Sequence, residues 1–245
     1  MTIYKHILNK KDKGEKLFAV LIDPDKQNEK SLMNTIEKAN HAKVDLFLIG
    51  GSILKKDTLD DCLSLLKEYS KIPTILFPGS TMQINNKADG LLFLSLISGR
   101  NPELLIGKQV VSAPIIKKSS LEALSTGYML IDGGTPTTVS YMSNTTPIPR
   151  GNNDIALCTA IAGEMLGLKL IYMDAGSGAE KPITKKMINI VRENIKIPLI
   201  IGGGINSVDK ALASCKAGAD IIVVGNAIEK NHLLITKLAN AVHAC

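Results

Sequence analysis

Tryptophan, aromatic residues in general and clustered charge are scarce in this sequence. It has no Trp, and aromatic residues make up 4% of its 245 residues. The net charge of +6 comes from 29 basic and 23 acidic residues, with the lysines spread singly and in short pairs. A nucleic-acid interface needs a basic cluster, and single-strand binding needs aromatic side chains for stacking. We therefore expect no nucleic-acid partner, while anionic small molecules and an anionic membrane surface stay candidates.

Signals for structural metal, disulfides, secretion and membrane insertion are also missing. The widely spaced Cys62, Cys158, Cys215 and Cys245 form no CxxC pair, so neither a zinc site nor a disulfide framework is indicated. The first residues, MTIYKHILNKKDK, lack the apolar stretch of a signal peptide. No apolar run approaches the length of a membrane span. We expect a cytoplasmic protein.

Short apolar runs recur along the chain, most of them followed by an amphipathic stretch. Each run is too short for a buried helix and nearly continuously apolar, as expected of a strand covered on both faces. Eight such strands predict a single (β/α)8 barrel domain over residues 1–245. An open doubly wound sheet is the alternative, but it usually has a glycine loop after the first strand, where this chain has Asp-Pro-Asp. The runs cover residues 17–23, 44–50, 73–77, 90–96, 127–132, 168–174, 197–202 and 219–225.

Two predicted connections depart from the repeat. Only residues 78–89 join the third and fourth strands, and they are poor in helix formers, so the third helix should be short or replaced by a loop. Residues 133–153 are long enough for a lid over the site, with Tyr141 as a candidate contact, and a mobile surface excursion is the alternative. The segment 154–167 predicts a helix. Its expected buried stripe is Ile155, Thr159, Ala162 and Leu166.

Glycines gather at the ends of the last three predicted strands, in YMDAGSGA (172–179), IGGGI (201–205) and VGNA (224–227). Glycine lets backbone N–H groups approach an anion closely, and a phosphate site after strands seven and eight recurs among such barrels. Tight turns are the alternative for any one of these runs. Three in succession favour a phosphate site, which several reaction classes share.

A carboxylate and a hydroxyl follow the first two predicted strands. Asp23 lies in IDPDKQ, and Ser52 follows two glycines. The pair suits Mg²⁺, which often takes one or two protein carboxylates and completes its shell with water and substrate phosphate. Alternatively, Asp23 caps a turn and Ser52 caps a helix, and Asp25 and Lys26 are as easily read as solvated turn residues. The four histidines lie outside the strand ends, so we expect no histidine acid–base chemistry.

These motifs, in this order and spacing, resemble the geranylgeranylglyceryl phosphate synthase family. IDPDK, GGS, VSYMSNTTPIP, YMDAGSGA, GGGI and VGNAI carry the resemblance, which covers about residues 17–235. Members are barrel prenyltransferases that join sn-glycerol 1-phosphate to geranylgeranyl diphosphate in ether-lipid synthesis. The resemblance implies a Mg²⁺-dependent enzyme. We also expect a homo-oligomer, and the net charge of +6 leaves peripheral contact with an anionic membrane open. The residues alone leave open a sugar-phosphate isomerase and a phosphate-binding protein without catalysis.

The resemblance also implies roles for individual residues. Asp23 and Ser52 match the family's Mg²⁺ pair. Asp174 stands where many members have Glu, and it would orient the glycerol hydroxyls and act as the catalytic carboxylate. Leu21 stands where the heptaprenyl branch usually has Lys, which favours a geranylgeranyl donor over a heptaprenyl one. The implied glycerol phosphate pocket comprises Tyr172, Met173, Asp174, Ala175, Gly176, Ser177, Gly178, Gly203, Gly204, Gly225 and Asn226.

Overall fold

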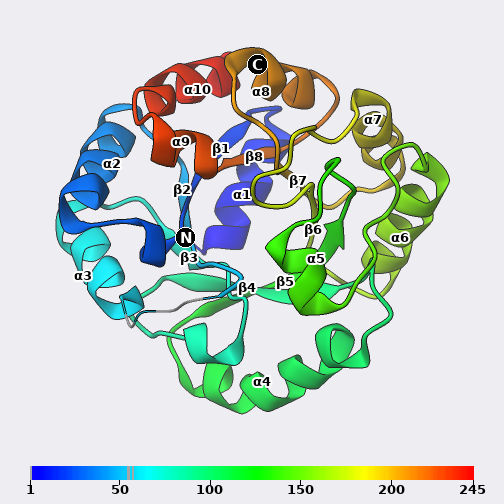
Figure 1. Cartoon of the computed structure of the whole chain (residues 1–245), viewed down its shortest axis with the longest axis horizontal. Helices are drawn as coiled ribbons and strands as arrows, with labels where there is room; N and C mark the ends of the chain where they lie inside the picture. Colours follow the sequence, from blue (N-terminus) through cyan, green and yellow to red (C-terminus); the bar gives the residue numbers. More distant parts are fainter. Residues whose placement is uncertain (1, 54–55, 57) are drawn as a thin grey trace.

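A computed structural model describes residues 2–53, 56 and 58–245. Eight parallel strands pair in chain order and close into a barrel, with β1 hydrogen-bonded to β8, which confirms the predicted fold class (Figure 1). The strands are β1 (Leu17–Ile22), β2 (Leu46–Ile49), β3 (Thr74–Leu76), β4 (Gly90–Leu96), β5 (Glu122–Leu130), β6 (Leu170–Asp174), β7 (Leu199–Gly202) and β8 (Ile221–Val224).

The helices lie mainly around the barrel, with α1 drawn over its centre and the short α5 and α9 over the strand ends (Figure 1). They are α1 (Ile3–Asp12), α2 (Glu29–His41), α3 (Leu59–Tyr69), α4 (Lys108–Lys118), α5 (Thr138–Ser143), α6 (Asn153–Met165), α7 (Lys185–Asn194), α8 (Val208–Lys216), α9 (Asn226–Lys230) and α10 (Leu234–His243). Short helical turns add η1 (Pro24–Lys26), η2 (Thr81–Gln83) and η3 (Glu103–Gly107). Between β3 and β4, residues 78–89 contain only η2. This confirms the prediction that the helix after the third strand is short or replaced by a loop.

Two hydrophobic layers follow from the two-residue period of the strands. Leu17 and Ala19 of β1 point into the barrel with Leu170 and Tyr172 of β6. The alternate side chains, such as Phe18 of β1, pack between the strands and the outer helices. Because almost every strand position is buried, the strands read as continuous apolar runs.

The strand starts are closed by α1, which the sequence analysis did not predict. Ile3 and Ile7 of α1 belong to the apolar cluster inside the barrel. The Glu122 carboxylate accepts hydrogen bonds from the backbone N–H groups of Ile3 and Tyr4 at the start of the helix. Glu122 also begins β5 five residues before the predicted residue 127, because the first residues of β5 include polar ones that an apolar pattern excludes.

The predicted buried stripe of α6 is wrong. Ala156, Ala160 and Gly163 face the barrel, while Ile155 and Leu166 are exposed. A side chain at Gly163 would meet Ile171 and Ile97 at 2.9 Å, so only small residues fit against the strands here. In the part of the chain that the structure describes, no helix is long and apolar enough to cross a membrane.

Candidate active site

The inward-facing rows of the strands end in the predicted site residues. On β1, the row of Leu17 and Ala19 continues by alternation to Asp23. On β6, the row of Leu170 and Tyr172 ends at Asp174. Parallel strands present their carboxyl ends at one rim of a barrel, where barrel enzymes keep their active sites. The fold therefore brings the two predicted carboxylates to the same rim.

Asp174 is a buried carboxylate, 7% exposed, whose two oxygens are both hydrogen-bonded. The Tyr128 hydroxyl donates to Oδ2 at 2.7 Å, and the backbone N–H of Gly176 donates to Oδ1 at 2.8 Å. Burial raises the pKa of Asp174 above its usual value, while these two hydrogen bonds partly oppose the rise. The side chain is held in one orientation, with a proton affinity above that of an exposed aspartate.

Three aromatic rings form the floor beneath Asp174. Phe77 stacks on Tyr172 with ring centroids 5.2 Å apart, and Tyr128 meets both rings edge-on, at 5.8 Å and 5.5 Å. Burial raises the pKa of Tyr128 and Tyr172 well above the usual value of a phenol, so both keep their protons. The floor uses three of the nine aromatic residues of the chain. Sequence reasoning missed Tyr128 and Phe77 because it did not assign inward and outward faces.

The glycines of the last strands make room for close backbone approach. A Cβ at Gly202 would lie 2.6 Å from the Tyr172 hydroxyl oxygen. Gly203 has a φ of +79°, and a Cβ there would lie 2.7 Å from Asp174 Oδ1 and 2.6 Å from the Ala175 nitrogen. Within the described ranges, the N–H groups of Ser177, Gly178, Gly203 and Gly204 donate to no protein acceptor. Unpaired N–H groups beside one another are what an anion site needs.

The predicted pocket residues differ in what they can offer a ligand. Met173 and Ala175 point into the layer behind the strands, so only their backbone faces the rim. Ser177 Oγ donates to Asn226 Oδ1 at 3.1 Å, which joins the β6 loop to the end of β8. We name the predicted glycine-rich pocket, from Tyr172–Gly178 with Gly203, Gly204, Gly225 and Asn226, the cradle.

The segment 133–153 is folded against the cradle. It contains α5, whose N-cap Thr137 lies 2.7 Å from where a Cβ of Gly176 would stand. Ile148 exchanges backbone hydrogen bonds with Leu130 and Asp132. Tyr141 of α5 is 86% exposed, so its predicted contact with a ligand stays a prediction.

Asp23 and Ser52 lie at the neighbouring ends of β1 and β2. Asp23 Oδ1 caps η1 by accepting from the Asp25 N–H at 3.2 Å, and a Cβ at Gly51 would lie 3.0 Å from the same oxygen. Ser52 does not cap a helix, since α3 begins later, with Thr58 as its N-cap. Among the described residues, no three His, Cys, Asp or Glu side chains gather into a metal site. A carboxylate and a hydroxyl at neighbouring strand ends still fit Mg²⁺, which takes its remaining ligands from water and substrate.

Gln83 supports this rim and was not found from the sequence. It is buried, donates through Nε2 to the Gly51 carbonyl at 2.9 Å, and accepts from the Gly79 N–H at 3.1 Å. The turn η2, which replaces the third helix, therefore fixes the backbone next to Ser52. No signal in the sequence separates Gln83 from an ordinary loop residue.

Lys26 and Glu229 also belong to the rim. Lys26 Nζ lies 3.2 Å from Asp23 Oδ2 and 3.8 Å from Glu229 Oε2. Burial raises the pKa of Glu229, and the Lys26 ammonium opposes the rise. Lys26 is an exposed turn residue of η1, as the alternative interpretation had it, and barrel closure also brings α9 next to it.

Comparisons with known proteins agree with this geometry. Residues 9–243 match the model of the PcrB family. The geranylgeranylglyceryl phosphate synthase of Chitinophaga pinensis is 59% identical over 99% of this chain and 96% of its own length. The protein of the same name from Saccharolobus solfataricus is 42% identical over 94% of this chain and 89% of its own.

A solved structure of a relative has the same fold and was determined with a substrate bound. The crystal structure of (S)-3-O-geranylgeranylglyceryl phosphate synthase from Thermoplasma acidophilum, in complex with its substrate sn-glycerol-1-phosphate, superposes with a TM-score of 0.94. The match covers all of both chains at 30% identity. Together, these matches show that the chain belongs to the PcrB family, among its geranylgeranylglyceryl phosphate synthases.

Proposed function

We propose that this chain joins sn-glycerol 1-phosphate to geranylgeranyl diphosphate in ether-lipid synthesis, with Mg²⁺ as cofactor. The observation that carries the proposal is the buried Asp174 beside the glycine cradle, with the Asp23 carboxylate at the same rim. One side of the rim suits a phosphate monoester and the other suits a metal-bound diphosphate. The Thermoplasma acidophilum relative, which binds sn-glycerol-1-phosphate, supports the choice of acceptor.

The cradle would bind the acceptor through its phosphate. The unpaired N–H groups of Ser177, Gly178, Gly203 and Gly204 are donors suited to phosphate oxygens. Asp174 would accept hydrogen bonds from the glycerol hydroxyls and fix which hydroxyl faces the donor. Since Asp is one methylene shorter than the Glu of many relatives, this contact is either direct or mediated by water.

Asp174 would also receive the proton of the reacting hydroxyl. The oxygen of the 3-hydroxyl forms a bond to carbon 1 of the prenyl chain, the bond from carbon 1 to the diphosphate oxygen breaks, and the diphosphate leaves with the bonding electrons. Burial raises the pKa of Asp174, which makes it a better base than an exposed aspartate. Holding two anchored substrates in line supplies a further part of the rate.

Asp23 and Ser52 would hold the Mg²⁺. When bound there, the cation neutralises the diphosphate and assists its departure as a Lewis acid. The protein's own contribution is to hold Asp23 in place through the η1 cap and the packing of Gly51. Gln83 secures the backbone next to Ser52.

The prenyl chain needs an apolar path away from the rim. We place it along the wall where η2 stands instead of a helix, between β3 and β4. Leu21 packs against Gly225: a Cβ added at Gly225 would lie 3.3 Å from the Cβ of Leu21. Leucine therefore stands where the heptaprenyl branch usually has lysine. This substitution favours the geranylgeranyl donor.

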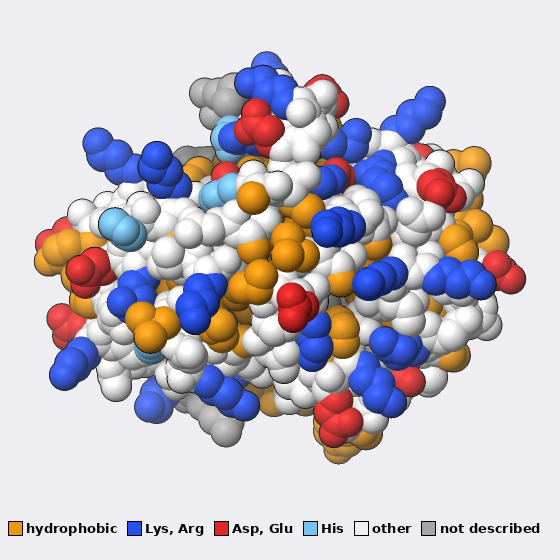
Figure 2. Space-filling model, turned by 90° about the horizontal axis from the view of Figure 1, so that it is seen from above, with side chains coloured by type: hydrophobic (Ala, Val, Ile, Leu, Met, Phe, Trp, Pro, Cys, Tyr) orange, Lys and Arg blue, Asp and Glu red, His pale blue; other side chains and the backbone are white. Residues whose placement is uncertain are grey.

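Self-association, a cytoplasmic location and contact with a membrane surface stay predictions. Large apolar side chains are exposed on α4, α5 and α6, which supports self-association. Figure 2 shows lysine and arginine side chains distributed over one side of the molecule, which supports contact with anionic lipid. Light scattering after gel filtration tests the first, and flotation with anionic and neutral vesicles tests the last.

Product formation tests the proposed function. Radiolabelled sn-glycerol 1-phosphate is incubated with geranylgeranyl, farnesyl or heptaprenyl diphosphate, each with Mg²⁺ and with EDTA. We expect Mg²⁺-dependent product, with geranylgeranyl diphosphate preferred. Turnover only with another donor keeps the reaction and overturns the chain length. Turnover that survives EDTA overturns the metal, and absence of turnover by folded protein overturns the reaction.

A further inference from the structure

Lys26 stands at the junction between the proposed metal rim and the cradle. Its Nζ lies 3.2 Å from Asp23 Oδ2, 3.8 Å from Glu229 Oε2 and 3.5 Å from Asn226 Oδ1. Lys26 ends η1, directly after β1, whereas Asn226 and Glu229 lie on α9, directly after β8. The pairing of β1 with β8 closes the barrel and brings these groups together across 200 residues of sequence.

The residues of the cradle carry no positive charge. Its members are glycines, Tyr, Met, Asp, Ala, Ser and Asn, and Leu21 supplies only a hydrocarbon side chain beside Gly225. Lys210 Nζ is nearby and donates to the Gly204 carbonyl at 3.3 Å, so it serves the backbone of the β7 loop. A phosphate monoester carries up to two negative charges, and backbone N–H groups alone balance them only in part.

Asn226 connects Lys26 to the cradle. Its Oδ1 accepts from Lys26 and from Ser177 Oγ, and its Nδ2 lies 3.8 Å from where a Cβ of Gly178 would stand. A ligand bound over Gly178 and Asn226 would therefore be next to Asn226, the residue to which the Lys26 ammonium donates a hydrogen bond. The Lys26 side chain is 46% exposed, so it has room to change rotamer without moving the core.

Asp23 and Glu229 hold the same ammonium from the other side. Their side chains are mostly buried and share Lys26 as their cation. Burial raises the pKa of Glu229, the Lys26 ammonium opposes the rise, and the Asp23 carboxylate adds to it. A second cation arriving at Asp23 would take over its charge and repel the Lys26 ammonium.

We propose that Lys26 couples the two sites, its ammonium being held by Asp23 and Glu229 in the metal-free chain and turning to the phosphate of sn-glycerol 1-phosphate when Mg²⁺ binds at Asp23. This inference rests on the proposed function, since it assumes that acceptor and that metal. Lys26 is then a residue of the acceptor site as well as of the metal rim.

Reciprocal coupling follows from thermodynamic linkage. If Mg²⁺ tightens the binding of sn-glycerol 1-phosphate by some factor, the acceptor tightens the binding of Mg²⁺ by the same factor, and such factors are typically about 5–150. In Lys26→Met the mobile charge is gone. The acceptor should then bind with one affinity, with or without Mg²⁺, and Mg²⁺ alone should bind more tightly because it no longer competes with an ammonium.

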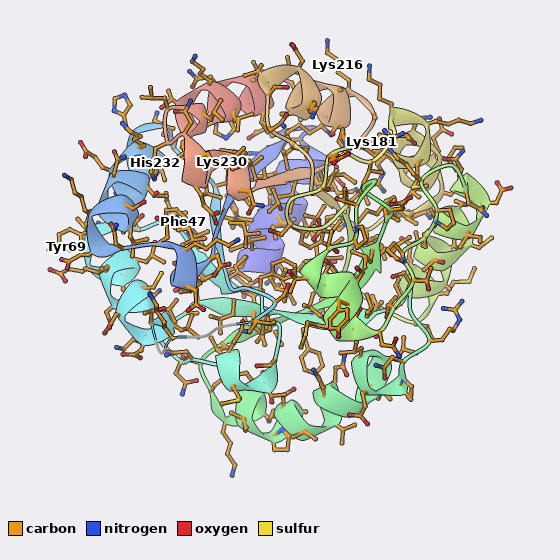
Figure 3. All side chains as sticks on the ribbon, in the orientation of Figure 1. Phe47, Tyr69, Lys181, Lys216, Lys230 and His232 are labelled. Carbon is orange, nitrogen blue, oxygen red and sulfur yellow. The ribbon has the colours of Figure 1, made fainter. Side chains whose placement is uncertain are left out.

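Calorimetric titration of sn-glycerol 1-phosphate, without prenyl diphosphate, tests the coupling. Wild type, Lys26→Met and Lys230→Met are each titrated in EDTA and in saturating Mg²⁺. Lys230 is the matched control, because it is an exposed lysine on α9, the helix that carries Asn226 and Glu229, and Figure 3 shows it there near His232. We expect wild type and Lys230→Met to bind at least about 5-fold more tightly with Mg²⁺. Lys26→Met should bind weakly and equally in both conditions.

The outcomes separate the coupling from the function. Equal coupling in Lys26→Met and wild type overturns the proposal, because the metal would then contact the acceptor directly. Absence of Mg²⁺ dependence in wild type overturns it as well. If folded wild type binds no sn-glycerol 1-phosphate in either condition, the proposed function itself has failed, and the role of Lys26 fails with it. Lys26→Arg, which keeps the charge, should restore part of the coupling.

Discussion

The two ends of the barrel are built from opposite materials. At the strand starts, Ile3 and Ile7 of α1 cover aliphatic strand residues. At the strand ends, the interior holds the Tyr128–Asp174 hydrogen bond, and Asp23 stands at the rim with Lys26. One end excludes water with apolar side chains, and the other keeps a carboxylate buried at a cost in stability.

The residues that stabilise the fold and the residues that carry the chemistry therefore lie at opposite ends of the same strands. The strands pass through both ends, yet their residues change from Leu and Ile to Asp and Gly within two or three positions. A barrel can therefore change its reaction at one rim while the opposite rim maintains the fold. Substitutions at the two ends should have opposite consequences, and the following predictions test that contrast.

Removal of the Asp23 carboxylate should have the largest effect on activity. We expect Asp23→Ala to lower kcat/KM by roughly 100- to 1,000-fold, because the metal and the Lys26 ammonium both lose a charged partner. Fold and melting temperature should change little. Steady-state kinetics at several Mg²⁺ concentrations measure the loss, with Asp209→Ala on the exposed face of α8 as control. Full Mg²⁺-dependent activity in Asp23→Ala would show that Asp23 is not a ligand of the metal.

Shortening Ile7 at the other end should affect stability alone. Ile7 is fully buried beneath the barrel, so Ile7→Ala should lower the free energy of unfolding by about 2–5 kcal/mol. Ile115→Ala, on the exposed side of α4, should change it by less than about 0.5 kcal/mol. Urea denaturation gives both values. A large loss of kcat/KM in folded Ile7→Ala would contradict the separation of the two ends.

Tyr128 should act by positioning Asp174. Tyr128→Phe removes a hydrogen bond to a carboxylate, worth about 1.5–3 kcal/mol, and should lower kcat/KM by roughly 10- to 100-fold. Since this hydrogen bond lowers the pKa of Asp174, its loss should move the acidic limb of the pH–rate profile to higher pH. Tyr69→Phe, at the outer edge of the molecule in Figure 3, is the control. A lower rate without a shift of the acidic limb of the pH–rate profile would show that Tyr128 acts only through packing.

The buried charge of Asp174 should produce the smallest effect, a gain in stability when it is removed. Because burial raises its folded pKa above 3.8, the folded state binds this proton more tightly than the unfolded state does. Its contribution to stability is therefore greatest below pH 3.8 and is lost as pH rises through the folded pKa. Asp174→Asn should melt higher than wild type at pH 7, by roughly 2–4 °C for each kcal/mol.

The pH dependence distinguishes this cause from a general packing effect. The gap between Asp174→Asn and wild type should narrow as the pH falls toward 4, where wild type gains the proton. Differential scanning calorimetry at both pH values measures the two gaps. A gap that is equal at pH 4 and pH 7 would show that charge burial is not its source.

The sequence was sufficient for the barrel and for the place of Asp23 and Asp174. Both follow continuous apolar runs, and the strand period fixes the rim they reach. The weak third crossover was also visible, because residues 78–89 are few and poor in helix formers. Such features depend on residues near one another in the chain.

The missed features depend on residues far apart in the chain. Lys26 looks like a turn residue until closure of β1 on β8 sets Asn226 and Glu229 beside it. The inner face of α6 is lined by Ala and Gly because Ile171 and Ile97 fill the space against it. A prediction based on large hydrophobic residues therefore chose the outer face of the helix as the buried one. Tyr128 gains its role only from the pairing of β5 with β6, which aligns Leu130 with Asp174.

The crystal structure of this chain with sn-glycerol 1-phosphate tests the central claim most directly, that the strand-end rim is the acceptor site. We predict the phosphate within hydrogen-bond distance of the N–H groups of Gly178, Gly203 and Gly204, with a glycerol hydroxyl at Asp174. A phosphate bound away from these glycines, with no glycerol oxygen near Asp174, would contradict the account.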